Sequence, residues 1–158
     1  MASTQRRGVQ YKVVRFEFRG YTAQQMEAIG SGLLTRGILP RIRMGQTVMD
    51  GPAPPLSDRY RKLKAEGKAR SPDGKQRGTN PIRDWFLTGR LMRSTKVIEK
   101  RDNQCTLGAT DATINARLFF NNRRARQFGV STKDRVVLLE EFHKQPPSVQ
   151  ARAKLVRI

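Results

Sequence analysis

This chain of 158 residues is poor in the side chains that disulfides, metal sites and catalysis most often use. It has one cysteine and one histidine, which excludes an intramolecular disulfide and a zinc site built from cysteines. It has no run of about eighteen apolar residues, the length that a membrane span needs. No apolar segment follows the arginines of its first residues, MASTQRRGVQ. We therefore expect a reducing compartment, no cleavable secretion signal and no membrane-spanning helix.

Residues suited to catalysis are also scarce. A catalytic site needs a nucleophile beside a base, a pair of facing carboxylates or a set of metal ligands. His143 falls near the end of a predicted helix, where a cation suits the helix dipole, and Cys105 has apolar neighbours that are typical of a buried structural thiol. Glu140 and Glu141 are adjacent and cannot face each other on a helix, so we expect them to be solvated or paired with Lys and Arg. The sequence predicts no enzyme activity, no metal and no cofactor.

Positive charge is what the chain has in excess. It contains 32 Lys and Arg against 13 Asp and Glu, which gives a net charge of +19. A chain with this charge repels itself unless an anionic partner lies close by. Nucleic acid is the most common partner of this kind, followed by an acidic protein surface and by an anionic membrane.

The N-terminal third predicts a strand followed by a helix. In residues 11–18, YKVVRFEF, apolar side chains alternate with polar ones, which is typical of a strand with one buried face. That face carries Val14, Phe16 and Phe18. Thr22 and Gln25 then have the spacing of a capping box that opens a helix.

An apolar stripe at helical spacing continues from this cap to residue 42. Its members are Met26, Ile29, Leu33, Leu34, Ile38, Leu39 and Ile42. Pro40 lies within the stripe and has no backbone N–H to donate. We therefore expect a kink or a break near Gly37.

The middle of the chain predicts loops around one short basic helix. Residues 50–57, DGPAPPLS, contain three prolines and form a loop. Residues 56–67 predict a short, very basic helix with Ser57 as its cap and Gly67 as its stop. The following loop, residues 67–80, is basic and almost free of apolar residues, and we expect it to be mobile when unbound.

The C-terminal half predicts a helix, a hairpin and two further helices. Asn80 and Pro81 mark the start of the first helix, which turns Ile82, Trp85, Phe86, Leu91 and Met92 inward. Residues 95–98 and 105–107 predict a hairpin joined by EKRDNQ.

Asp111 is predicted to cap the next helix, which buries Ile114, Leu118 and Phe119. An arginine-rich connection covers residues 121–130, and Ser131 with Asp134 opens a last helix. That helix is predicted to bury Val136, Val137, Leu139 and Phe142 and to stop at Pro146 and Pro147. The remainder is either a tail or a final strand.

This order of elements has no alternation of strands with crossover helices. We therefore expect an α+β fold in which a small antiparallel β-sheet packs with several helices, with a long basic loop and extended termini. Residues 1–145 are predicted to form one domain with the mobile basic loop 67–80, and residues 146–158 a C-terminal tail.

Two basic regions are candidates for contacts with DNA or with an acidic partner. Residues 59–101 hold fourteen Lys and Arg against four acidic residues, and a second cluster precedes Phe128. The candidate residues are Arg59, Arg61, Lys62, Lys64, Lys68, Arg70, Lys75, Arg77, Arg123 and Arg124. They form either an electrostatic surface for phosphates or a solvated face that pairs with acidic neighbouring subunits. Most aromatic residues are at core-type positions, so reading of bases is not expected.

Four segments, in this order, carry a resemblance to a known family. They are GPAPPLSDRYRKLKAEGK, WFLTGRLMRSTKV, CTLGATDATINARLFFNN and RARQFGVSTKD, and they fall within residues 50–140. In this order they resemble the phage virion morphogenesis or tail-completion family. The matching positions are Leu87, Thr88, Gly89, Leu91 and Ser94, then Ala116, and then Arg126, Phe128, Gly129, Ser131 and Asp134.

The resemblance implies a structural virion protein of a tailed phage, assembled in the host cytoplasm and located at the head–tail junction or in the proximal tail. It implies a homo-oligomeric ring around the DNA passage, with portal, adaptor or tail-tube proteins and packaged double-stranded DNA as partners. Arg90 and Arg93 are predicted to face away from the apolar stripe of their helix. They join the matching residues 87–94, Arg126, Phe128 and Gly129 as candidates for the subunit interface. The alternative is a basic nucleic-acid-binding protein of the ribosomal or nucleoid type.

Overall fold

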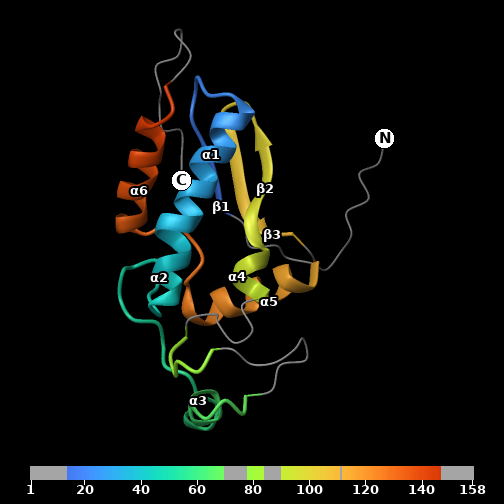
Figure 1. The fold of residues 1–158 in the computed structure, drawn as a ribbon, viewed down its shortest axis with the longest axis vertical. Coiled ribbons are helices and arrows are strands. Elements are labelled where there is room, and N and C mark those ends of the chain that lie inside the picture. The colour runs from blue at the N-terminus through green and yellow to red at the C-terminus, as the bar shows by residue number, and fades with distance from the viewer. Residues whose placement is uncertain (1–13, 70–77, 84–89, 111, 147–158) are drawn as a thin grey trace.

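A computed structural model describes residues 14–69, 78–83, 90–110 and 112–146 of the chain. It has an α+β architecture in which helices pack on a three-stranded antiparallel sheet (Figure 1), as the sequence predicts. The predicted extended termini and most of the loop 67–80 lie outside the described residues. The same holds for the candidate residues Leu87, Thr88, Gly89, Arg70, Lys75 and Arg77.

The sheet has the strand order β1-β3-β2, and both pairings are antiparallel. The strands are β1 (Val14–Glu17), β2 (Thr95–Arg101) and β3 (Gln104–Ala109). Phe16 of β1 lies opposite Cys105 of β3, and Leu107 of β3 lies between Val14 and Val97. Since these residues share one face, Val14 and Phe16 of the predicted alternation lie on the inner surface of the sheet.

The first part of one long helical segment, α1 (Ala23–Leu33), covers that surface. The segment continues as the π-helical turn η1 (Leu34–Ile38) and α2 (Leu39–Arg43). The capping box of Thr22 and Gln25 opens it, as predicted. The irregularity predicted near Gly37 is the π-helical turn, in which the Leu39 N–H donates to the Leu34 carbonyl five residues earlier. The chain therefore stays helical through Pro40, which lies in the first turn of α2.

The remaining helices complete the body. On the side of α1 away from the sheet lies α6 (Thr132–His143), and α5 (Ala112–Ala125) crosses one end of these layers (Figure 1). The short helix α4 (Arg90–Ser94) leads into β2, and α3 (Asp58–Ala65) lies beyond α5 at the end of the molecule. The core is built mainly from the sheet and the helical segment of α1, η1 and α2, with two residues of α5 and one of α6.

Gly30 allows α1 to approach the sheet closely. A Cβ at this position would lie 2.5 Å from Cys105 Sγ, 3.0 Å from Leu107 Cδ2 and 3.1 Å from Val97 Cγ2. We expect Gly30→Ala to lower the free energy of unfolding by about 1 to 3 kcal/mol, because the overpacking outweighs the gain in helix propensity. Urea unfolding measures this, with the exposed Ser31→Ala on the same helix as the control. An unchanged midpoint for Gly30→Ala would show that the contact is not tight.

Two predicted boundaries in the C-terminal half are wrong. Residues 81–83 form bends instead of the start of a helix, because the carbonyls of Ile82 and Arg83 accept hydrogen bonds from the Lys64 Nζ and the Gln127 Nε2. The hairpin has longer strands and a shorter turn than predicted. Asn103 closes it in a left-handed conformation, with φ at 65°.

The predicted connection 121–130 is also too long, because α5 continues to Ala125 and only the residues after it link α5 to α6. On α6 the predicted burial is wrong at two positions. Val136 is 56% exposed and Leu139 is 51% exposed, whereas Leu138 is 1% exposed. The helix therefore turns a different face to the core from the one predicted.

Candidate functional site

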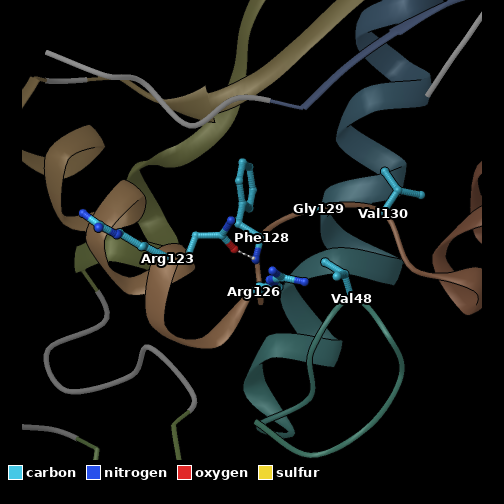
Figure 2. Close-up of a pocket in the computed structure, with 7 residues that line it drawn as sticks. Val48, Arg123, Arg126, Phe128, Gly129 and Val130 are labelled. Atoms are coloured by element: carbon cyan, nitrogen blue, oxygen red, sulfur yellow. Dashed lines mark hydrogen bonds between the residues drawn. The ribbon is translucent and has the colours of Figure 1, made fainter. Parts of the chain in front are cut away.

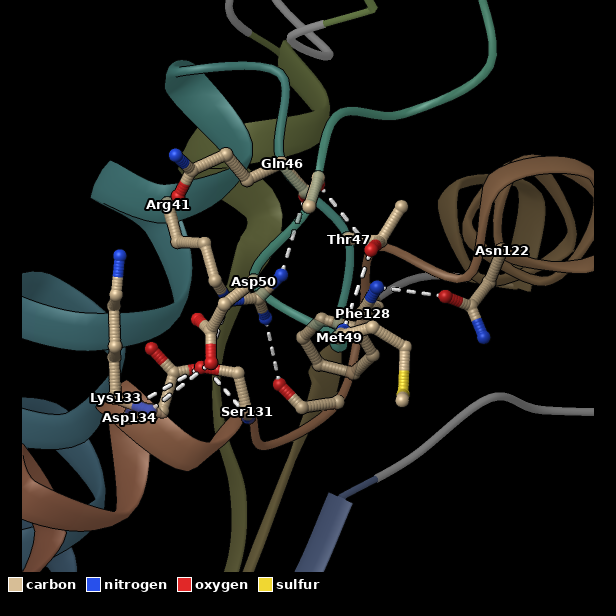
Figure 3. A network of polar contacts seen from close by, with 12 residues as sticks. Arg41, Gln46, Thr47, Met49, Asp50, Asn122, Phe128, Ser131, Lys133 and Asp134 are labelled. Atoms are coloured by element: carbon tan, nitrogen blue, oxygen red, sulfur yellow. Dashed lines mark hydrogen bonds and ion pairs between the residues drawn. The ribbon is translucent and has the colours of Figure 1, made fainter.

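A buried arginine holds together the loop after α2, the start of α6 and the connection before it. Arg41 is 5% exposed, and its Nε donates to Asp134 Oδ2 at 2.8 Å. Its Nη1 donates to the Gln46 carbonyl at 3.2 Å and its Nη2 to the Gly129 carbonyl at 2.9 Å (Figure 3). One guanidinium thus joins the loop after α2 to the stretch of chain that leads into α6, which lies far away in the sequence.

The N-terminus of α6 is capped from two directions. Ser131 and Asp134 form the predicted capping box, and Asp50 Oδ2 accepts a further hydrogen bond from the Lys133 backbone N–H at 3.2 Å. Burial raises the pKa of Asp50, but hydrogen bonds from the Ser131 side chain and the Lys133 N–H outweigh it and leave the pKa below its usual value. Asp50 therefore stays ionised at the positive end of the helix dipole.

These contacts create a hollow beside the end of α5. The Val48 N–H donates to the Arg126 carbonyl at 2.9 Å, which brings the loop after α2 next to the residues that follow α5. The hollow measures about 520 Å³ (Figure 2), and we call it the basic hollow. It is lined by Val48, Asn122, Arg123, Arg126, Phe128, Gly129 and Val130.

Most described basic candidates are exposed. Arg59, Arg61, Lys62 and Lys68 are exposed on or beside α3, and Arg123 is exposed on α5. The prediction is wrong for Lys64, which is 3% exposed and donates to the Ile82 carbonyl at 2.9 Å. This lysine attaches α3 to the segment after it and is not available to a phosphate. Nothing is described of the side chain of Arg124, although its backbone lies in α5.

The candidates for the subunit interface divide into surface and core residues. Arg90 and Arg93 are exposed, as predicted, whereas Leu91 is partly buried against the core. Phe128 is 1% exposed, so its side chain is a core residue and cannot contact another subunit in this fold. A Cβ at Gly129 would lie 2.8 Å from Val48 Cγ1. Close packing against Val48 therefore explains why this position is a glycine.

The four candidates for catalysis are exposed, buried in the core or paired with a basic side chain. His143 is exposed, and burial raises the pKa of the Cys105 thiol to about 12. Arg36 pairs with both Glu140 and Glu141. A hydrogen bond from Lys144 lowers the pKa of Glu141, against the effect of burial, and the bond from Arg36 lowers it further. No group of three or more His, Cys, Asp or Glu that could hold a metal ion occurs among the described residues.

Several large apolar side chains lie on the surface. They are Met44, Met49, Ile98, Val136 and Leu139, and their exposed fractions run from 38% to 81%. None of the helices in the described ranges has the length and apolar character to cross a membrane. No protein-family model, curated protein or solved structure matches the chain.

Arg41 and its pairing with Asp134 were not predicted from the sequence. The available signal was an arginine within the apolar stripe, one residue before Ile42 and three residues after Ile38. A position with such neighbours is buried, and a buried guanidinium needs a carboxylate and further acceptors. The pattern could have predicted that Arg41 is buried, but it could not have identified Asp134 as the partner.

Proposed function

We propose that this chain is a structural virion protein of a tailed phage that forms a ring at the head–tail junction. Two things support the proposal: the ordered resemblance over residues 50–140 and the outer face of α6. The outer face of α6 consists of Thr132, Val136, Leu139 and His143, which are all exposed. It is the observation on which the proposal chiefly rests.

This face has the character of a protein contact. Val136 and Leu139 lie one turn apart and both are more than half exposed, on a helix that already buries Leu138 on its inner side. Adjacent exposed apolar side chains mark contact surfaces more often than scattered ones do. A contact between unlike surfaces of successive copies closes into a ring when the rotation per subunit permits.

The net positive charge of each copy opposes that assembly. Copies that each carry +19 repel one another, and salt screens this repulsion over about 8 Å at physiological ionic strength. An anionic neighbour would therefore stabilise the ring, either packaged DNA in the passage or acidic surfaces of portal, adaptor or tail-tube proteins.

The test replaces the two apolar residues together, as Val136→Asp with Leu139→Asp. Because both side chains are exposed, we expect the melting temperature to change little and the ring to be lost, as measured by native mass spectrometry. The matched control places two aspartates on the exposed side of α1, as Gln24→Asp with Ala28→Asp. Normal rings from the α6 variant would remove this face from the interface.

Quantitative mass spectrometry of virus particles from the source tests the location. We expect a fixed small ratio of this chain to the portal subunit. Absence of the chain from particles would contradict the proposal and would favour the alternative of a basic nucleic-acid-binding protein.

One observation favours that alternative. Residues 112–130 contain four arginines and no Asp or Glu, and two of these arginines line the basic hollow. Under the alternative, nucleic acid is the main ligand, and the chain binds it without assembling, with an affinity that falls steeply as salt rises. A ring component self-associates or binds a portal regardless of the nucleic acid present.

A further inference from the structure

The basic hollow brings together two arginines that the sequence assigned to different surfaces. Arg123 belongs to the last turns of α5, and Arg126 follows the end of that helix. Both are exposed and both line the hollow. Figure 2 shows Arg126 directed toward Val48 and Arg123 extending from α5 in the opposite direction, on the other side of Phe128.

Arg126 has an unusual backbone conformation. Its φ is 46°, in the left-handed region that side chains other than glycine rarely adopt. The conformation is fixed on both sides, because the Arg126 N–H donates to the Asn122 carbonyl at 2.7 Å and the Arg126 carbonyl accepts from the Val48 N–H at 2.9 Å. The buried Asn122 also accepts from the Phe128 N–H through its Oδ1 at 2.6 Å. An arginine thus stands where the backbone alone would favour glycine.

The hollow carries positive charge from two arginines. Within the part of the chain that the structure describes, no carboxylate pairs with Arg123 or Arg126. The end of a helix favours nearby cations, which accounts for a basic residue in the last turn of α5. It does not account for the second arginine in a strained position beyond the helix. Two guanidinium groups on a concave surface favour an anionic ligand with separated negative charges.

The lining also indicates how such a ligand is held. Among the lining residues that the structure describes, Phe128 is the one aromatic side chain, and at 1% exposure it cannot stack on a base. The other lining side chains are two valines and Asn122, and the Oδ1 of Asn122 is already used. The hollow therefore suits phosphate groups and not base edges.

We infer that the basic hollow binds the phosphodiester backbone of double-stranded DNA through Arg123 and Arg126, independently of sequence. This inference rests on the proposed function, since it names the part of each subunit that contacts DNA in the passage of the ring. The DNA contact is measured on the isolated chain, so its failure and the failure of ring formation are separate results.

The test measures the anisotropy of a labelled 30-base-pair duplex over a series of salt concentrations. We expect Arg123→Gln with Arg126→Gln to weaken binding and to reduce the slope of log affinity against log salt by about 2, one unit for each lost phosphate contact. The matched control removes the same charge at the far end of the sheet, as Arg19→Gln with Arg101→Gln. We expect the control slope to stay near that of the unmodified chain.

Two further measurements distinguish a contact with DNA from an effect on folding and from binding of an acidic protein. Arg126→Gly suits the left-handed backbone, so we expect it to keep the melting temperature while it lowers the slope by about 1. Poly-glutamate, used as a competitor, represents an acidic protein surface. Equal slopes for the hollow and control pairs would overturn the inference. Loss of poly-glutamate binding with unchanged DNA binding in the hollow pair would also overturn it and would indicate a protein partner.

Discussion

Replacing Arg41 with methionine is expected to lower the free energy of unfolding by about 3 to 5 kcal/mol, because the change leaves the carboxylate of Asp134 buried and unpaired. Asp134 is 2% exposed, so water cannot replace the lost guanidinium. The Gln46 and Gly129 carbonyls lose a donor as well. Urea unfolding followed by circular dichroism measures the loss.

Two variants make this expectation specific. Arg43→Met, on the exposed side of the same helix, is expected to change stability by at most about 0.5 kcal/mol. In the double variant Arg41→Met with Asp134→Leu, the buried carboxylate is gone, and we expect part of the stability to return. The recovery is incomplete, because Asp134 also caps α6. A stability for Arg41→Met equal to that of Arg43→Met would contradict the buried network.

The second large effect contrasts two neighbouring leucines on α6. Leu138→Ala is expected to cost about 2 to 5 kcal/mol, since its side chain is 1% exposed and its removal leaves a cavity against α1 and the core. Leu139→Ala is expected to change stability by at most about 0.5 kcal/mol, since Leu139 is 51% exposed.

The two substitutions delete the same atoms one residue apart, so differences in helix propensity cancel. Chemical denaturation of both variants under one set of conditions gives the comparison. Equal losses would mean that α6 is rotated from the position described, and they would return Leu139 to the core where the sequence pattern placed it.

Signals that act over a few residues were sufficient to predict much of this fold. The alternation in residues 11–18 predicts β1, and the cap residues Thr22, Ser57 and Ser131 mark the first residues of three helices. Each of these signals depends on backbone geometry within a few residues. Predictions made from them therefore do not depend on contacts with distant parts of the chain.

The inward face of α6 could not be predicted in the same way. Residues 136–139 are four consecutive apolar residues, VVLL, so the hydrophobic pattern does not decide which of them is buried. The decision comes from Asp134 and Glu141, which lie on the same face as Leu138 and pair with Arg41 and Arg36. An acidic residue on an inner face contradicts the usual pattern, and only its distant partner explains it.

Only one side of the basic hollow could be predicted from the sequence. The sequence shows that Arg123 and Arg126 are close to each other, but Val48 comes from a loop far away along the chain. The hydrogen bond between the Val48 N–H and the Arg126 carbonyl holds Val48 beside Arg126, where Val48 forms one wall of the hollow. No local pattern indicates such a contact, because it depends on how Arg41 positions the loop.

That dependence has a consequence for binding. The loop that carries Val48 is attached to α6 through Asp50 and to the core through Arg41, so the walls of the hollow belong to the same cooperative unit as the interior. A ligand then finds both arginines on a backbone that is already ordered. The protein therefore loses little conformational entropy when the ligand binds. The affinity then reflects the contacts themselves and not a cost of ordering the site.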